Sequence, residues 1–318
     1  MAEHTLAATP DTVHWGRFWA DLPPVLTVAP GDTVEVQTFS GRRAVLPPAG
    51  SGMTVDPAHR AILDADIDGS AHLLTGPIAV SGAEPGDLLS IGIEDIALGA
   101  DWGWNVVRPS AGTLPVEFPV STATTTIIPI DRAARTARLP WGTDLPLAPF
   151  FGVMGVAPPP EWGELTSVQP RMHGGNLDLK LLTAGATLHL PVHVAGALLS
   201  LGDGHGCQGD GEVCITALET ALTGRLRLDV FKDGATGPVQ GPWAETADEV
   251  ISMGFHASLD TALQLALRQM IALIGVRTGL GQTEAYQLCS LACDFAVTQS
   301  VNQEKGVHGR IRKALIRG

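Results

Sequence analysis

Side chains that could bind a metal or move protons gather in residues 202–212, GDGHGCQGDGE. Asp203 and His205 are oxygen and nitrogen donors of the kind that Zn²⁺ and similar divalent cations accept. Three more side chains could orient a water molecule or take its proton: Gln208, Asp210 and Glu212. The pattern favours metal-assisted or acid–base chemistry on a small molecule, although an acidic surface turn could have the same composition.

The glycines of this stretch predict a tight loop. Glycine in a helix or strand interior gives up backbone entropy without contributing packing, so this density is typical of a loop whose backbone approaches something closely. Apolar runs at 194–201 and 213–222 flank it. We therefore expect the loop to lie between buried elements and to contact an ion or small substrate.

A second polar cluster lies at residues 170–180, PRMHGGNLDLK. Asn176 and Asp178 are two apart, so in an extended segment they would point to the same side. Asp178 is then a candidate metal ligand. Alternatively, Asn176 satisfies a turn, and Asp178 pairs with a nearby cation, Lys180 or Arg171.

Three histidines outside the glycine stretch are weaker candidates. His14 precedes Trp15-Gly16, His72 precedes the turn signal at 75–77, and His173 precedes two glycines. A lone histidine is most often a hydrogen-bonded structural residue. These three therefore need support from elsewhere in the chain.

The elements that must position these residues are mostly strands over the first 230 residues. Pro-Gly-Asp turns lead into apolar runs at 33–38 and 88–93, and a weaker echo lies at 187–190. The proline-rich span 140–160 predicts an irregular excursion over the body. This order favours a β-sandwich or jelly-roll-like body over a doubly wound sheet, which would need helices between strands.

Helical signals come late in the chain. Ser258 can cap a helix whose apolar residues repeat at three-and-four spacing over 259–274, with Gly275 placed to end it. A second helix is expected from Thr283 to about Leu291. We interpret both apolar stripes as core contacts.

The expected fold is mainly β with appended α-helices, an α+β protein. We expect a single domain over 1–318, with a β-rich body at about 1–235 and a helix-containing region at about 245–318. No run of about 18 apolar residues exists, and the first residues lack the features of a signal peptide. The sequence therefore predicts a soluble cytoplasmic protein.

Charge and composition narrow the partners. With 20 basic and 33 acidic residues the formal net charge is −13, which disfavours nucleic acid or an anionic membrane as partner. The hydrophobic fraction is 45% and the charged fraction only 17%. A surface this apolar favours a homo-oligomer.

The four cysteines form no CxxC pair, and a chain of this size needs no disulfides. Cys289 and Cys293 would share one face of the second helix and pack there. Cys207 is a conceivable nucleophile, but the sequence fixes no cation or second imidazole beside it. The chain has no G-x-S-x-G elbow and no Walker loop, so serine chemistry and phosphate binding lack support.

Taken together, these segments resemble the acetamidase/formamidase family. The resemblance is carried in order by HWG at 14–16, PGDTV at 30–34, LTGP at 74–77, GAEPGD at 82–87, PFFGVMGVAP at 149–158, HGGNLD at 173–178, GDGHGCQGDGE at 202–212 and CDFAVTQSVN at 293–302. It implies a β-sandwich enzyme with appended helices that hydrolyses the C–N bond of short amides and releases ammonia. It also implies a bound divalent metal and a homo-oligomer. Gly206 stands where many relatives have alanine, which leaves the acyl-group preference open.

Residue roles follow from combining the resemblance with the chemistry of amide hydrolysis, which needs activated water and charge stabilisation for the oxyanion. The ligand pool for a divalent ion, with Zn²⁺ as first candidate, is His72, Asp178, Asp203 and His205, of which three would bind directly and leave an open position. Glu212 is the candidate general base and proton donor. The expected hydrogen-bonding partners of the substrate amide or oxyanion are Gln208 and Asn176. The supporting and lesser candidates are Asp210, His14 and His173.

Two alternatives remain open on sequence. The hydrolysed bond could belong to a carbamate, a urea-like compound or a lactam. The chain could instead be a non-catalytic, metal-dependent ligand-binding sandwich, although an aromatic content of 5% offers no obvious binding platform. Ligand binding without turnover would distinguish this second alternative.

Overall fold

Strands form where turn signals and alternating apolar residues predict them. In the computed structural model, which describes residues 1–118, 121–232 and 239–317, the three expected strands lie within β5 (Asp32–Thr38), β7 (Leu88–Leu98) and β15 (Thr187–Pro191). The boundary expected near residue 235 lies outside the described residues. The prediction of a mostly β protein with appended helices is confirmed.

One sheet has nine strands and joins the two ends of the chain. Its spatial order is β1 (Glu3–Leu6), β5, β18 (Leu222–Phe231), β7, β15, β19 (Trp243–Glu245), β20 (Glu249–His256), β22 (Lys305–Arg312) and β21 (Asp294–Gln299). The β7–β18 pair is its longest ladder, antiparallel from Leu98↔Leu222 to Leu88↔Phe231. Strands from the β-rich body and from the C-terminal region therefore share one sheet.

The second sheet has eleven strands and carries the polar segments. Its main path is β11 (Asp144–Pro146), β10 (Thr136–Arg138), β9 (Thr124–Asp131), β8 (Trp102–Val107), β17 (Leu218–Glu219), β16 (Leu199–Cys207), β12 (Phe150–Gly155) and β14 (Gly174–Asn176). β6 (Leu73–Val80) pairs with β16 and also with β2 (Val13–Trp15) and β4 (Leu26–Val28). A small separate pair consists of β3 (Arg17–Phe18) and β13 (Leu165–Thr166).

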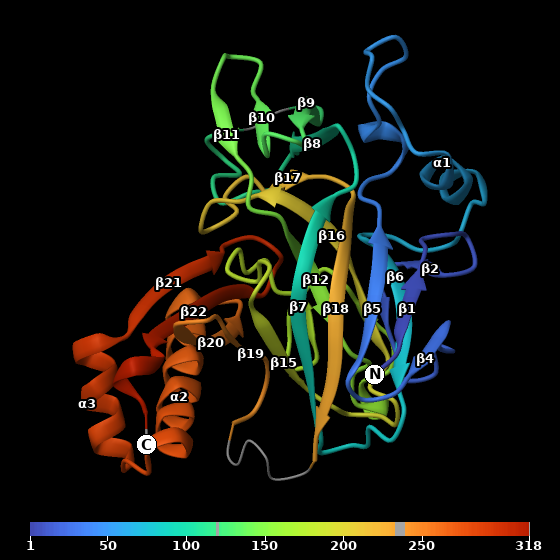
Figure 1. The fold of residues 1–318 in the computed structure, drawn as a ribbon. Coiled ribbons are helices and arrows are strands. Elements are labelled where there is room, and N and C mark those ends of the chain that lie inside the picture. The colour runs from blue at the N-terminus through green and yellow to red at the C-terminus, as the bar shows by residue number, and fades with distance from the viewer. Residues whose placement is uncertain (119–120, 233–238, 318) are drawn as a thin grey trace.

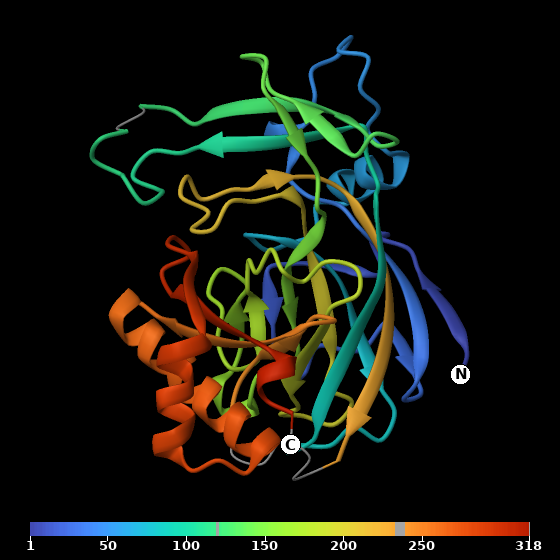
Figure 2. The same ribbon diagram turned by 60° about the vertical axis from the view of Figure 1, so that its left-hand side comes forward.

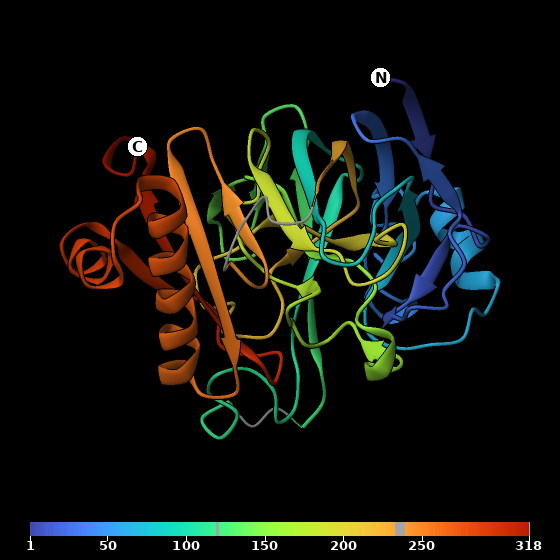
Figure 3. The ribbon, with the colours of Figure 1, turned by 90° about the horizontal axis from the view of Figure 1, so that it is seen from below.

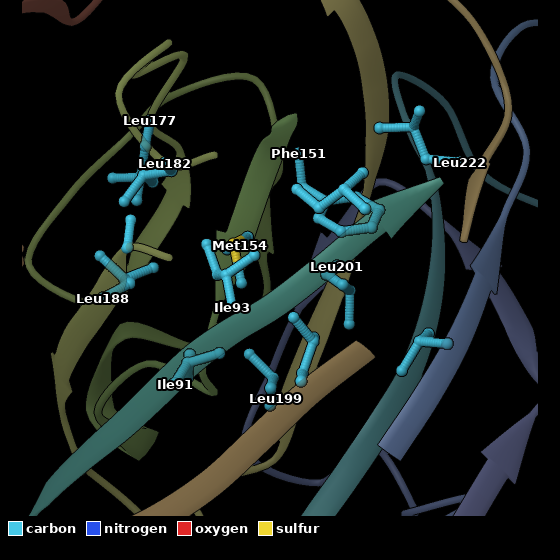
Figure 4. Close-up of a cluster of buried hydrophobic side chains, with 14 of the residues drawn as sticks. Ile91, Ile93, Phe151, Met154, Leu177, Leu182, Leu188, Leu199, Leu201 and Leu222 are labelled. Atoms are coloured by element: carbon cyan, nitrogen blue, oxygen red, sulfur yellow. The ribbon is translucent and has the colours of Figure 1, made fainter. Parts of the chain in front are cut away.

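The two sheets meet across one apolar core. Ile91 and Ile93 of β7 in the first sheet lie close to Leu199 and Leu201 of β16 in the second, with Phe151 of β12 beside them (Figure 4). All five side chains are buried. The core face of β16 leads along the strand toward the polar residues at its end.

The described residues also form three α-helices, α1 (Pro57–Asp64), α2 (Leu259–Thr278) and α3 (Gln282–Ala292), and short 3₁₀ turns at Arg43–Val45, Pro160–Trp162 and Lys313–Leu315. The two expected C-terminal helices are present, with Ser258 at the N-cap of α2. The expected end at Gly275 is wrong. The helix continues to Gly279, whose φ of +75° is a left-handed C-cap that glycine adopts without strain.

Helices α2 and α3 lie on one side of the molecule beside β20–β22 (Figures 1 and 3). By length and mean hydropathy, 1.3, α2 could cross a membrane. Its Ala262 and Ala266 pack with Val307 of β22, and its Met270 and Leu273 lie in a separate buried cluster. We interpret α2 as a core helix of the domain.

The expectation of an irregular excursion over 140–160 is wrong for part of that span. β12 lies there as a fully buried strand, paired with β16 on one side and β14 on the other. Prolines flank this strand but do not interrupt it, so its backbone donors stay available to both neighbours.

The prediction of a loop over 202–212 is also wrong for its first half, because β16 continues through Cys207. A Cβ on Gly202 would lie 2.2 Å from the Leu73 carbonyl oxygen, and one on Gly204 would lie 2.5 Å from that of Thr220. These glycines therefore let neighbouring backbones approach a strand, which is the other use of glycine in a sheet.

Gly204→Ala is expected to destabilise the fold by at least about 2 kcal/mol, because the added carbon collides with backbone and with Leu222, 2.7 Å away. Gly209→Ala is the matched control, since no heavy atom lies within 4 Å of its Cβ position. Urea unfolding measures both. Equal midpoints for the two variants would contradict this packing argument.

Candidate active site

Four buried carboxylates surround one buried imidazole where β16, β17 and the segments after β14 and β16 meet. The imidazole is His205, and the carboxylates are Asp178, Asp203, Glu212 and Glu219. The structure thus brings together four residues from the two polar segments of the sequence and adds Glu219. β17, β16 and β12 are consecutive strands of the second sheet, with β17 above the other two in Figure 1 and in the turned view of Figure 2.

His205 lies at the centre of the cluster. Its Nε2 is 3.2 Å from Asp203 Oδ2 and 3.2 Å from Glu219 Oε1, yet neither contact has hydrogen-bond geometry. The ring also meets Phe150 edge-on, with centroids 4.9 Å apart. The Nε2 atom therefore points among carboxylate oxygens, as a metal-binding nitrogen would.

Gln208 fixes the orientation of that ring. Its Nε2 donates to the Asp178 backbone carbonyl at 2.8 Å, which leaves its Oε1 as the acceptor facing His205 Nδ1 at 3.0 Å. His205 then carries a proton on Nδ1, and when neutral it presents the Nε2 lone pair to the cluster. Such an outer hydrogen bond is the usual partner of a metal-binding imidazole.

His72 stands at the edge of the cluster. Its Nε2 lies 3.8 Å from Asp203 Oδ2, and its Nδ1 lies 2.8 Å from Ser167 Oγ. The side chain is partly exposed, with 23% of its surface accessible. His72 therefore reaches one carboxylate from the solvent side.

Asn302 joins two of the carboxylates. Its amide nitrogen donates to Asp178 Oδ2 at 2.5 Å and lies 3.5 Å from Glu212 Oε2. The segment that contains it reaches the site from beyond α3, between β21 and β22. Asn302 ends the family segment 293–302, but its residue type gave no reason to choose it, because an asparagine in a polar turn is commonplace.

Glu219 is the other residue that the sequence analysis missed. It is 2% exposed, its Oε1 accepts the Ala217 N–H at 3.0 Å, and its Oε2 accepts from Ser40 Oγ at 3.3 Å. A signal was present, because Glu219 is the single charge in the otherwise uncharged run 216–224. A lone carboxylate inside a buried strand needs a partner or a function.

Burial and neighbouring carboxylates raise the pKa values of three acids in the cluster. Burial raises the pKa of Asp178 to about 6, against the opposing charge of His205. Burial and the Asp203 charge raise the pKa of Glu219 to about 7. Burial and Asp178 raise the pKa of Glu212 well above its usual range. Like charges at this spacing cannot all ionise without a compensating cation.

The other two groups of the cluster, Asp203 and His205, carry opposite charges. Burial disfavours the Asp203 carboxylate, but the imidazoles of His72 and His205 outweigh it and lower the pKa of Asp203. Burial likewise disfavours charge on His205, but Glu219 and Asp203 outweigh it and raise the pKa of His205. The proton that these acids hold on His205 occupies the position that a cation would take.

The backbone is left-handed at four non-glycine residues of the cluster. The φ angles of Asp178, Asp203, Glu212 and Asn302 are +48°, +56°, +43° and +26°. Such conformations cost about 1–3 kcal/mol each and persist where surrounding structure enforces them. Their coincidence at one cluster points to a site whose geometry is maintained for function.

The cluster contains two groups of donor atoms that could hold a divalent cation. Donor atoms of Asp178, Asp203 and His205 lie within 4.8 Å of one another, as do those of His205, Glu212 and Glu219. Asp178 Oδ1 and His205 Nε2 are buried without hydrogen-bond partners in the described part of the chain. This set of carboxylates and one imidazole is chemically suited to a divalent cation.

Because Gly152 of β12 has no side chain, it leaves room between these donor atoms. A Cβ there would lie 2.7 Å from His205 Cε1, 2.8 Å from Asp178 Oδ1 and 2.8 Å from Asp203 Oδ2. Any side chain would therefore press into the donor atoms.

A cavity of about 380 Å³ opens onto the cluster. Its lining includes Asn176, Asp203, Glu212, Glu219 and Asn302, together with residues of the 40–45 segment and of β8. Asn176 donates to the Val168 carbonyl at 3.2 Å, while its buried Oδ1 has no partner among the described residues. A small molecule entering the cavity can therefore meet an amide acceptor and the carboxylates together.

Three sequence candidates lie apart from the cluster. Asp210 is half-exposed and pairs with Lys180 at 2.9 Å, so Lys180 is not the partner of Asp178. His14 Nε2 lies 3.0 Å from Ser200 Oγ. His173 is fully buried, packs edge-on against a phenylalanine, and has no hydrogen bond within the described ranges.

Cys207 ends β16 and packs against the main apolar core. Burial raises the pKa of its thiol, which opposes thiolate formation. The four cysteines are free in the structure.

Comparison with known proteins gives one consistent group. A sequence model of the acetamidase/formamidase family matches residues 2–165 and 163–305. The chain is 29% identical to a formamidase from Methylophilus methylotrophus and 27% identical to an acetamidase from Mycolicibacterium smegmatis, over 69% of this chain in each case. The matches span 64% and 66% of those two proteins.

The fold has the same relatives. The chain superposes on the crystal structure of an acetamidase from Bacillus halodurans with a TM-score of 0.83 and 30% identity, covering 98% of both chains. A predicted acetamidase/formamidase from Thermoanaerobacter tengcongensis gives 0.83 and 27%, covering 99% of this chain and 97% of that one.

Proposed function

The chain belongs to the acetamidase/formamidase family, and from that membership we propose that it hydrolyses the C–N bond of short-chain amides to a carboxylate and ammonia. The observation that carries the proposal is the cluster around His205. It combines donor atoms at cation-binding spacing, a buried acid above its usual pKa and a cavity for a small molecule. The alternative substrates for the same chemistry are carbamates, urea-like compounds and lactams.

We assign the cation to Asp178, Asp203 and His205, with His72 as the additional donor at the solvent side. These nitrogen and oxygen donors suit Zn²⁺, which is our first candidate. The chemistry that such an ion supplies when bound is Lewis-acid activation of water and of the amide carbonyl. Gln208 contributes by fixing the His205 ring.

Glu212 is the proposed proton carrier. Its buried carboxyl lines the cavity and lies 3.5 Å from the Asn302 amide, so its position is set by a neighbour rather than by solvent. It would take a proton from water and return one to the leaving nitrogen, which must depart as ammonia. Asn176 Oδ1, buried and unpartnered within the described residues, would accept a hydrogen bond from the substrate NH₂.

Incubation with formamide, acetamide and propionamide is expected to release ammonia, and chelation is expected to abolish this activity until Zn²⁺ or another divalent ion is returned. The physical reason is that none of the described residues at the cluster is an activated nucleophile, so hydrolysis depends on activated water. Full activity of metal-free protein, verified by elemental analysis, would overturn the assignment. Cys207→Ala should retain turnover, whereas a thiol mechanism requires its loss.

Assembly and location complete the proposal. We expect a homo-oligomer in the cytoplasm, with a small amide as partner and neither nucleic acid nor membrane. The family resemblance and the apolar composition support the oligomer.

A further inference from the structure

The cavity is larger than formamide or acetamide requires. A water molecule takes about 30 Å³ of liquid volume, so an amide of three or four heavy atoms needs roughly 100 Å³. The cavity measures about 380 Å³. Besides the carboxylates, its lining includes residues of β8 and the residue that follows it.

One face of β8 lines this cavity beside the cluster. Trp104 pairs with Glu219 across the sheet, and the cavity lining also includes Val106 and Arg108. Trp104 and Val106 are two apart in the strand and point to one side, and Arg108 directly follows the end of β8 at Val107. Along the chain, the lining therefore passes from the neighbour of an acidic residue to an apolar and then to a cationic residue.

The guanidinium at the end of this part of the lining is free. Arg108 is exposed, and no ion pair or side-chain hydrogen bond formed by described residues involves it. A second arginine of the lining, Arg42, is held in place: its Cζ lies 3.8 Å from the Trp15 ring centroid, and it donates to the Gly69 carbonyl at 2.7 Å. Two cations thus border the cavity of a protein with a net charge of −13.

The apolar part of the cavity lining offers one hydrogen-bond donor. The Trp104 indole N–H is buried and has no acceptor among the described residues. The same nitrogen would lie 2.8 Å from a Cβ on Gly41, another lining residue. A bound molecule with an acceptor group could satisfy this donor, because buried donors without partners are costly.

We propose that the natural substrate of this site is an amide whose far end carries a carboxylate, that is, the monoamide of a short dicarboxylic acid. The inference rests on the proposed amidase function. The guanidinium of Arg108, with Arg42 beside the cavity, attracts the carboxylate. With the carboxylate held there, the amide carbonyl would lie toward His205 and Glu212, and the methylene groups against Val106.

Kinetics with matched substrates test this proposal. Succinamate and 4-oxopentanamide have the same chain length and amide, but only succinamate carries a carboxylate. The wild-type protein should favour succinamate in kcat/KM by about tenfold, and Arg108→Gln should reduce this ratio by about tenfold. Arg108→Lys should retain most of the preference, since the charge remains. Arg43→Gln is the control, because Arg43 pairs with Asp64 and does not line the cavity.

Binding measured by calorimetry separates this proposal from the amidase function. Levulinate carries the carboxylate but has a ketone in place of the amide, and hexane-2,5-dione is its neutral counterpart. Levulinate should bind more tightly than the dione, and the difference should shrink in Arg108→Gln and at high ionic strength. Equal binding of the two compounds overturns the inference even if amides are hydrolysed. Preferential levulinate binding without turnover of any amide supports the inference and overturns the amidase function.

Discussion

Glu212→Gln is expected to lower kcat by about 10²–10⁴-fold while the protein keeps its fold and its metal, the range expected for loss of one general acid–base group. The amide replaces a carboxyl that lines the cavity and can still accept the Asn302 contact, so the geometry of the cluster survives. Metal stoichiometry by elemental analysis, measured with kcat on the same preparations, checks the prediction.

Asp203→Asn and His205→Ala provide the comparison. Each removes a donor from the group that contains Asp178, so both should lose metal together with rate. If Glu212→Gln instead purifies without metal, the second donor group, His205 with Glu212 and Glu219, holds the ion and another residue moves the proton. Near-normal turnover in Glu212→Gln would mean that the acid–base role of Glu212 is misassigned.

Gly152→Ala is expected to reduce the metal content of the protein and to lower kcat/KM more than 100-fold. Its added carbon would stand within 2.8 Å of His205, Asp178 and Asp203 atoms, so the donors must separate. A displacement of this size at a catalytic centre can cost two orders of magnitude in rate. Elemental analysis and amide hydrolysis measure the two effects.

Gly209→Ala is the matched control for this variant, because it adds the same carbon in the same polar segment with no neighbour within 4 Å. Its metal content and activity should equal those of the wild type. A Gly152→Ala protein that unfolds at the wild-type urea concentration but lacks metal would place the effect at the donors. Normal metal and activity in that variant would remove Asp178, Asp203 and His205 as the ligand group.

Local patterns predicted the elements that depend on local physics. Pro-Gly-Asp turns identified the strands at 33–38 and 88–93, a weaker echo of that pattern identified the strand at 187–190, and three-and-four spacing identified the longer C-terminal helix. The error over 202–207 has a definite cause. A glycine-rich sequence fits a loop or a strand that neighbours approach closely, and the choice depends on the distant Leu73 and Thr220 carbonyls.

The same distinction applies to the site. Asp178, Asp203, His205, Gln208 and Glu212 could be nominated because their side-chain chemistry is concentrated in two short segments. The structure brings these five together.

Contacts between residues far apart in the chain determine which of the other candidates belong to the site. Asp210, His14 and His173 have the same chemistry as the chosen residues, but strand register and an ion pair with Lys180 place them elsewhere. Asn302 and Gly152 lie inside two of the family segments, 293–302 and 149–158, but their residue types gave no reason to assign them to the site. Their importance depends on which strands lie opposite one another, which periodicity does not encode.

The hydrogen bond from Asn302 to Asp178 spans 124 residues of chain. During synthesis, Asp178, Asp203, His205 and Glu212 leave the ribosome well before Asn302, and contacts between distant residues form late because loop closure must precede them. The carboxylate cluster therefore stays incomplete on the nascent chain. A polypeptide interrupted before residue 302 should fold much of its sheet and still have no amidase activity. Only chains whose synthesis has passed residue 302 should therefore form an active site.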